Sequence, residues 1–271
     1  MKRQELADTI KSHRNFLCVG LDTDLQKVPQ KFLKEKYPLF AFNKEIIDAT
    51  RDHCVAYKPN VAFYEAYGSK GWEQLEMTAS YLPDTHFRIA DAKRGDIGNT
   101  SARYAEAFFK QMPFDAVTVA PYMGEDSVTP FLSFDDKWVI VLGLTSNKGS
   151  ADFQHMQENG ETLFERVMRR TAAWGDTGNT MFVVGATHPE AFAGIRKIIP
   201  DHFLLVPGVG AQGGDLRAVA QSGLNTDGGL LINSTRDIIY ASSGDDFQEA
   251  AAAKASILAA EMSSLLAEQN L

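Results

Sequence analysis

The segment DAKRGDIGNT, residues 91–100, carries the most informative set of reactive side chains in this sequence. It places Asp91, Lys93 and Asp96 in an acid–x–base–x–x–acid row where an apolar run ends. Strand alternation puts Asp91 and Lys93 on the same side of the chain, and Asp96 follows in the turn that opens the next helix. Such a row would hold a lysine ammonium between carboxylates as a proton donor. The pattern also fits a helix-capping cluster, because Asp96 and Asn99 are favourable near a helix N-terminus.

A second segment, PGVGAQGGD at residues 207–215, has the composition of an anion-binding turn. Its glycines permit close backbone approach, and the following helix would present unpaired N–H groups and a positive dipole to an anion. The next apolar run ends in NSTRDI, which brings Arg236, whose guanidinium can grip two phosphate oxygens. Barrel enzymes often bind phosphate with the loops after strands seven and eight. These features predict a ligand that carries a phosphate.

The elements that position these groups repeat along the chain. Short apolar runs alternate with segments of helical period, and about 30 residues separate one run from the next, as in βαβ units. The runs are residues 16–22, 54–58, 87–91, 116–120, 138–144, 181–186, 203–207 and 229–233, and the helical segments are residues 41–52, 72–81, 100–111, 161–174, 189–198, 215–222 and 246–268.

Eight near-continuously apolar runs are typical of a parallel sheet that helices bury on both faces. We therefore predict a single (β/α)8 barrel domain over residues 1–271, with its core at about 16–267. A doubly wound open sheet is the alternative, but the first run ends in VGLDTD without the glycine-rich dinucleotide turn of that fold. The irregular segment 143–160 is expected to be a loop that could cover a site, and the lysine-rich insert 27–37 a solvated surface excursion.

Polar residues gather where the predicted strands end, which in a barrel is the rim that bears the active site. Each one alone has a structural explanation as a cap, a turn former or an exposed lysine, but their convergence on one rim favours a binding site. They are Asp22, Lys58, Asp91 with Lys93, Thr145 with Ser146, the segment 208–212 that ends at Gln212, and Arg236.

Composition excludes several classes of protein. The 27 Lys and Arg against 35 Asp and Glu give a net charge of −8, which disfavours nucleic-acid binding. Cys18 and Cys54 lie in apolar runs, as reduced core thiols do. The N-terminus has no apolar signal core and no segment approaches the ~20 apolar residues of a membrane span, so we expect a cytoplasmic protein without a membrane partner. The histidines are scattered without metal-ligand spacing, and no metal or nicotinamide site is predicted.

Taken together, VGLD, YKPN, DAKRGDIGNT, LTSN, PGVGAQGGD and STRD resemble the orotidine 5′-phosphate decarboxylases, and more narrowly their second bacterial subfamily, the mycobacterial type. The resemblance runs in order from about residue 16 to residue 267. It implies a (β/α)8 barrel that forms a homodimer through the open ends of its barrels. It also implies conversion of orotidine 5′-monophosphate to UMP and CO2, the last step of de novo UMP synthesis, without a cofactor or a metal.

The resemblance assigns roles residue by residue. Lys58, Asp91 and Lys93 match the charged catalytic network, with Lys93 stabilising and protonating the C6 carbanion. The partner subunit would contribute Asp96, Ile97 and Thr100 to a shared site. Substrate binding falls to Asp22 at the ribose, Ser146 at the pyrimidine, and Pro207, Gln212 and Arg236 around the phosphate.

Two other functions stay open at this point. Metal-dependent hexulose-phosphate synthases and ketogulonate-phosphate decarboxylases share the barrel and the DxKxxD string, but they would place an acidic metal ligand near Lys58 and Asn60. A catalytically silent sensor of phosphoribosyl ligands would be expected to lack Lys93 or Asp96, and both are present. A fused orotate phosphoribosyltransferase is not expected, because no residues remain for it.

Overall fold

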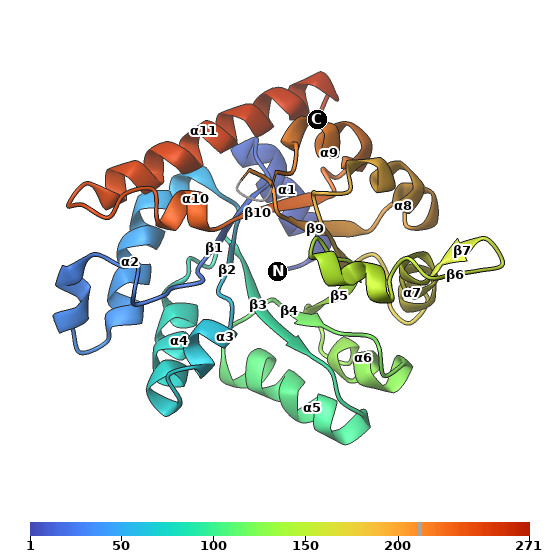
Figure 1. Cartoon of the computed structure of the whole chain (residues 1–271), viewed down its shortest axis with the longest axis horizontal. Coiled ribbons are helices and arrows are strands. Elements are labelled where there is room, and N and C mark those ends of the chain that lie inside the picture. Colours follow the sequence, from blue (N-terminus) through green and yellow to red (C-terminus); the bar gives the residue numbers. More distant parts are fainter. Residues whose placement is uncertain (211–212) are drawn as a thin grey trace.

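A computed structural model describes residues 1–210 and 213–271, and in it helices surround a closed barrel of parallel strands (Figure 1). The strands follow one another in chain order around the barrel, and the last pairs with the first. They are β1 (Leu17–Gly20), β2 (Ala56–Lys58), β3 (Phe87–Arg94), β4 (Ala116–Val119), β5 (Trp138–Leu144), β8 (Thr180–Val184), β9 (Phe203–Pro207) and β10 (Leu230–Ser234). The predicted (β/α)8 fold is confirmed, and the open-sheet alternative is wrong.

Each predicted helical segment overlaps a helix on the outside of the barrel, and α6 lies outside the predicted segments (Figure 1). The larger helices are α2 (Pro38–Thr50), α4 (Ser69–Tyr81), α5 (Gly98–Glu106), α6 (Glu125–Leu132), α7 (Leu163–Ala172), α8 (Phe192–Ile198), α9 (Leu216–Gly223) and α11 (Phe247–Glu268). Three shorter or terminal ones are α1 (Arg3–His13), α3 (Ala62–Glu65) and α10 (Arg236–Ile239). Local sequence sets some of their starts: α7 begins at a capping box in which Thr162 and Glu165 satisfy each other's backbone N–H groups.

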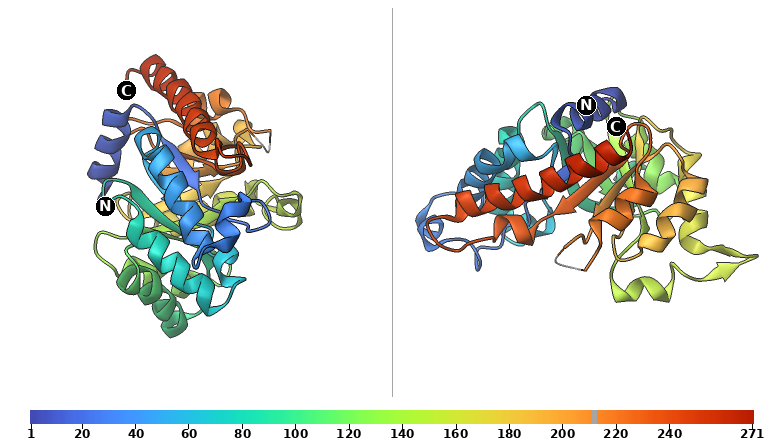
Figure 2. Two further views of the ribbon diagram at one scale, coloured as in Figure 1. Left: turned by 90° about the vertical axis from the view of Figure 1, so that its left-hand side faces the viewer. Right: turned by 90° about the horizontal axis from the view of Figure 1, so that it is seen from above.

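The two long inserts contain more structure than predicted. Segment 143–160 includes the 3-10 turn η4 (Lys148–Asp152) and the strand β6 (Gln157–Glu158), which pairs with β7 (Glu161–Thr162). Figure 2 shows this hairpin projecting from the end of the barrel opposite α1 and the chain termini. The insert 27–37 is not wholly solvated: in η1 (Gln30–Lys34), Phe32 is buried with its ring 5.4 Å from the ring of Phe42. This aromatic anchor ties the insert to α2.

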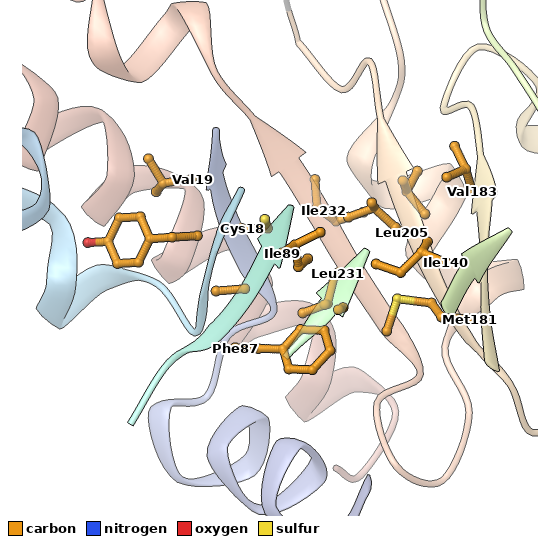
Figure 3. Close-up of a cluster of buried hydrophobic side chains, with 14 of the residues drawn as sticks. Cys18, Val19, Phe87, Ile89, Ile140, Met181, Val183, Leu205, Leu231 and Ile232 are labelled. Atoms are coloured by element: carbon orange, nitrogen blue, oxygen red, sulfur yellow. The ribbon is translucent and has the colours of Figure 1, made fainter. Parts of the chain in front are cut away.

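Buried apolar side chains from β1, β3, β5, β8, β9 and β10 meet in and around the barrel wall (Figure 3). Leu205 and Ile232 lie on the paired strands β9 and β10 and are almost fully buried. Cys18 and Cys54 are buried free thiols, as predicted. Burial raises the pKa of Cys54 to about 12, so this thiol stays protonated and packs as a small apolar group.

Helix α11 departs from the expectation that no segment is long and apolar enough to span a membrane. Its 22 residues have a mean hydropathy of 1.2 in the most apolar window, which meets that criterion by length and composition. The helix packs along α2 and β1 and buries Phe247, Ala255 and Met262. The many alanines of α11 account for its mean hydropathy. Their small side chains also allow the helix to lie close to the barrel.

Hydrogen bonds from Arg196 secure the end of the barrel that carries the chain termini. The Arg196 guanidinium donates hydrogen bonds to the backbone carbonyls of His202, Gly223 and Gly229 at 2.6–2.9 Å. The His202 ring is buried beside Phe182, and neither of its nitrogens has a hydrogen-bond partner among the described residues. Burial, with the cations of Arg3 and Arg196, lowers the pKa of His202 to about 4. The folded protein therefore holds this imidazole neutral.

We expect His202 to make the folded state less stable in mild acid. Between its ordinary pKa of 6.5 and about 4, the unfolded chain binds a proton that the folded chain does not, so stability falls as the pH falls. From pH 7 to pH 5 this loss should be about 1–2 kcal/mol after allowance for partial solvent access. Urea unfolding of wild type and His202→Leu at both pH values measures it. The wild type should lose more stability than the variant, whereas the exposed-site control His13→Gln should behave as wild type; equal losses in wild type and His202→Leu would contradict the assignment.

Candidate active site

Strand register brings two oppositely charged side chains together at the carboxyl ends of β2 and β3. Lys58, the last residue of β2, pairs with Gly20 of β1, and Asp91 of β3 forms a bridge with Asn60 just beyond β2. Both charged residues are buried, with 4% and 8% of their surface exposed. The Lys58 ammonium donates a 2.8 Å hydrogen bond to Asp91 Oδ2. Lys58 is therefore not an exposed strand-end lysine.

The Asp91 carboxylate is the centre of the site because three donors converge on it. Lys58 binds Oδ2, while Lys93 Nζ at 2.6 Å and the Thr118 hydroxyl at 3.0 Å both bind Oδ1. Burial opposes ionisation, but the two ammonium groups outweigh it and hold the pKa of Asp91 well below its usual range. The carboxylate is thus a permanent negative charge inside the barrel mouth.

Nearby opposite charges likewise keep Lys58 protonated. Burial alone would lower the pKa of Lys58, but the carboxylates of Asp91 and Asp22 raise it above its ordinary value. Burial raises the pKa of Asp22, although Lys58 opposes that shift. Asp22 Oδ1 is buried without a hydrogen-bond partner among the described residues. A buried, unpaired carboxylate oxygen is costly, so this atom is suited to receive a ligand hydroxyl.

Lys93 reaches Asp91 through an irregular part of β3. The backbone of Lys93 is left-handed, with φ of +47°, and the β3–β4 register shifts between Ala90 and Arg94. The Lys93 side chain is half exposed, and its ammonium donates a hydrogen bond to Asp91 Oδ1. A cation in this position can act on a group that enters the mouth.

A cavity of about 150 Å³ lies beside this charged cluster. Its wall comprises Asp22, Lys58, Asp91, Pro207, Gly208, Val209, Asn233, Ser234, Thr235, Arg236 and Asp237. The strand ends approach closely here: a Cβ on Gly20 would lie 1.9 Å from Thr235 Oγ1, so only glycine fits. The exposed Arg236 side chain has no hydrogen bond or ion pair with any residue in the described ranges, and it is available to an anion.

The predicted phosphate site differs in one respect from the sequence expectation. The N-terminus of α9 does not offer all its N–H groups, because the Asp215 carboxylate caps the helix by accepting a hydrogen bond from Ala218 N. A carboxylate at this cap repels a second anion. The glycine turn and Arg236 therefore remain as the groups that could hold a phosphate, while Gln212 lies outside the described residues.

Five predicted site residues do not line the cavity: Lys93, which binds the wall residue Asp91, and Asp96, Ile97, Thr100 and Ser146. Asp96 does not contact Lys93; its carboxylate accepts a hydrogen bond from Ile97 N, and its backbone is bonded to Ser101. Asp91, Lys93 and Asp96 therefore do not form the expected acid–base–acid row within one chain, because the backbone turns away after β3. Ile97 and Thr100 are exposed on the same turn, at the start of α5. Ser146 lies beyond β5, where a Cβ on Gly185 would approach its backbone nitrogen to 2.8 Å.

Sequence reasoning missed several polar residues of this site. Thr118 is the single hydroxyl in the apolar strand AVTV, a signal that could have been noticed. Asn233, Thr235 and Asp237 lie in the NSTRDI segment, from which only Arg236 was selected. His155 does not reach the cavity wall; its ring centre lies 5.7 Å from that of His188, with the two rings tilted by 56°. No group of three or more potential metal ligands occurs within residues 1–210 and 213–271.

Comparison with known proteins gives one consistent family. A profile of the orotidine 5′-phosphate decarboxylase / HUMPS family matches residues 15–253. A curated relative from Phocaeicola vulgatus, named orotidine 5′-phosphate decarboxylase, is 56% identical over 272 residues, which cover 99% of this chain and 100% of the relative.

Solved structures agree with that result. Leishmania donovani OMP decarboxylase has a TM-score of 0.84 and 36% identity, covering 98% of both chains. Leishmania donovani UMP synthase has a TM-score of 0.85 and 39% identity over 96% of this chain. The present chain spans only 55% of that synthase.

We expect the buried pair to be strongly coupled. Asp91→Asn removes the charge that neutralises Lys58 and should lower the free energy of unfolding by about 3 kcal/mol. Adding Lys58→Met to that variant should restore more than half of the loss, because the uncompensated buried cation is then gone. Urea unfolding of the two single variants and the double variant at pH 7 measures the coupling.

The exposed pair Arg217–Glu268, joined at 2.7 Å between α9 and α11, is the matched control. Glu268→Gln should cost less than about 1 kcal/mol, since solvent screens this pair. Strict additivity of the Lys58 and Asp91 substitutions, or equal losses at the two pairs, would contradict the buried coupling.

Proposed function

This chain belongs to the orotidine 5′-phosphate decarboxylase / HUMPS family, and we propose that it converts orotidine 5′-monophosphate to UMP and CO2. As a carboxy-lyase it would perform the last step of de novo UMP synthesis. The observation that carries this proposal is the cluster in which Asp91 lies between the ammonium groups of Lys58 and Lys93 at the barrel mouth. Such a cluster combines a fixed negative charge with a proton donor beside a ligand cavity.

The proposed chemistry uses only side chains of the protein. The C6–carboxylate bond of the pyrimidine breaks, CO2 leaves, and the electron pair stays on C6 as a carbanion. The Lys93 ammonium stabilises this charge as it develops and then transfers its proton to C6. Solvent returns a proton to Lys93 after UMP leaves. Asp91 and Lys58 hold that ammonium in place before the substrate arrives, so little reorganisation is needed during the reaction.

The remaining groups would bind the substrate away from the reacting bond. Asp22, with its unpartnered Oδ1, accepts a ribose hydroxyl, and Ser146 meets the pyrimidine. Pro207, Arg236 and Gln212 surround the phosphate, with Arg236 supplying the positive charge. Binding energy from the distant phosphate can then lower the barrier at C6.

The active enzyme is proposed to be a homodimer with shared sites. Ile97, Tyr122 and Met123 are 56%, 89% and 50% exposed on the turns after β3 and β4, at the open end of the barrel. A second copy covering this apolar surface would bring its Asp96, Ile97 and Thr100 to the Lys93 of the first. This arrangement would complete the acid–base–acid row that one chain leaves open.

Two finer assignments belong to the same proposal. The DAKRGDIGNT and PGVGAQGGD strings support the mycobacterial-type subfamily, and the single barrel over residues 16–267 would be the whole catalytic domain, working in the cytoplasm. A metal-dependent sugar-phosphate reaction is the alternative within the same barrel. Its acidic metal ligand would fall near Lys58, where a buried ammonium paired with Asp91 would repel a metal cation.

Lys93→Ala should lower kcat for orotidine 5′-monophosphate by about 10³-fold or more while the variant stays folded, because both charge stabilisation and the proton donor are lost. The loss of substrate absorbance, followed in EDTA, measures turnover. Lys254→Ala on the surface of α11 is the control and should retain wild-type rates. A wild type that is silent here but active with Mg²⁺ on a pentulose phosphate or ketogulonate phosphate would overturn the proposal.

Mixing two inactive variants tests the shared site. An exchanged dimer of Asp96→Ala and Lys93→Ala has one site with an intact Lys93 and an intact partner Asp96. Random pairing should therefore restore about a quarter of the wild-type rate. Subunit exchange is verified with differently tagged chains, and no recovery after exchange would exclude a site shared in this way.

A further inference from the structure

Thr118 of β4 lies opposite the irregular segment of β3. The paired positions Ala90–Val117 and Arg94–Val119 leave three residues of β3, numbers 91–93, opposite Thr118 alone on β4. Both charged residues that meet at the barrel mouth from β3, Asp91 and Lys93, belong to this bulged segment. Thr118 itself is only 1% exposed.

The two hydrogen bonds of Thr118 have a single possible direction. The backbone N–H of Lys93 can only donate, so Thr118 Oγ1 accepts it at 2.8 Å. The one hydroxyl proton is then free for Asp91 Oδ1 at 3.0 Å, and an ionised carboxylate can only accept. The hydroxyl therefore joins the backbone of Lys93 to the carboxylate that binds the same lysine's ammonium.

This link replaces a hydrogen bond that the bulge removes. Regular parallel pairing would give the Lys93 N–H a carbonyl of β4, but the left-handed backbone of Lys93 and the register shift take it out of the ladder. The neighbouring backbone groups are satisfied elsewhere, since Asp91 N donates to Pro59 O and Ala120 N donates to Arg94 O. Without the hydroxyl, Lys93 N would be left unpaired where Thr118 packs.

Given the decarboxylation proposed above, on which this role rests, we propose that Thr118 is a positioning residue that sets the place of the Lys93 ammonium through Asp91 and through the Lys93 backbone. Half of the Lys93 side chain is exposed, and its ammonium has one hydrogen bond among the described residues, at 2.6 Å to Asp91 Oδ1. That oxygen is the one that the Thr118 hydroxyl also binds. The chain of contacts thus fixes a flexible side chain at both its base and its tip.

Thr118→Val removes the hydroxyl and keeps the shape, so it separates positioning from packing. We expect kcat for orotidine 5′-monophosphate to fall about 10- to 100-fold, the cost of a small misplacement of a reacting group. KM should stay within about threefold, because the ribose and phosphate groups are untouched. Thr118→Ser, which retains the hydroxyl, should recover most of the lost kcat.

A matched control accounts for the general cost of losing a buried hydroxyl. Thr180 in β8 is also 1% exposed, and its hydroxyl donates to Asn179 Oδ1 at the other end of the barrel. Thr180→Val and Thr118→Val are both expected to lower Tm by a few degrees. Only Thr118→Val should lower kcat; an equal fall in both variants would reduce Thr118 to a structural role and overturn the proposal.

A second readout does not depend on turnover. Competitive acetylation with acetic anhydride, followed by peptide mass spectrometry, reports how firmly the Lys93 amine is held. Lys93 should be modified several-fold faster in Thr118→Val than in wild type, Thr118→Ser or Thr180→Val. If the wild type does not decarboxylate the substrate, the proposed function fails and this labelling still decides the role of Thr118. If the wild type is active but Thr118→Val matches it in kcat and in labelling, only the positioning role fails.

Discussion

The buried ion pair between Lys58 and Asp91 is the interaction on which the rest of the site depends. Two charges placed inside a barrel lose their hydration, and their mutual attraction compensates only if the geometry is good and the remaining hydrogen bonds are made. The barrel meets that requirement with the 2.8 Å contact between them and with two further donors on Asp91. One permanent negative charge thereby becomes available to orient the half-exposed Lys93.

That requirement explains why β3 is irregular at its most reactive point. A regular strand would keep every ladder hydrogen bond, but residues 91–93 give up their pairing with β4 so that Lys93 can turn toward Asp91. The hydroxyl of Thr118 satisfies the backbone group that this turn leaves unpaired. A strained backbone conformation costs free energy. Such strain is found at functional sites, where the neighbouring side chains hold the conformation in place.

The two ends of the barrel have different roles. At the end near the termini, Arg196 binds several backbone carbonyls, which serves stability, and the buried His202 is held neutral. At the opposite end the strands finish in charged and hydroxyl groups, and the turns expose apolar side chains such as Tyr122. Barrel enzymes divide their ends in this way because loops can vary at the mouth without disturbing the strand pairing below.

Much of the fold could be predicted from local patterns. All eight strands were located from short apolar runs, and β5 and β9 have the predicted limits, because burial on both faces leaves a continuous apolar signature. The limits of the other strands differ from the prediction by one to three residues; β3 continues past Asp91, and the insert at 27–37 is anchored by Phe32. Neither contact leaves a local sequence signal.

The sequence by itself determined the barrel, the charged residues at its mouth and the association of Asp91 with Lys93, since these depend on strand period and on neighbours two positions apart. Only the tertiary structure decided that Lys58 is buried against Asp91, 33 positions away, and that Thr118 binds the same acid from 27 positions away. It also decided that Asp96 leaves its own lysine and that Asp215 caps α9. Side-chain direction at these places follows from barrel register and from one bulge, and both arise only when distant strands pair.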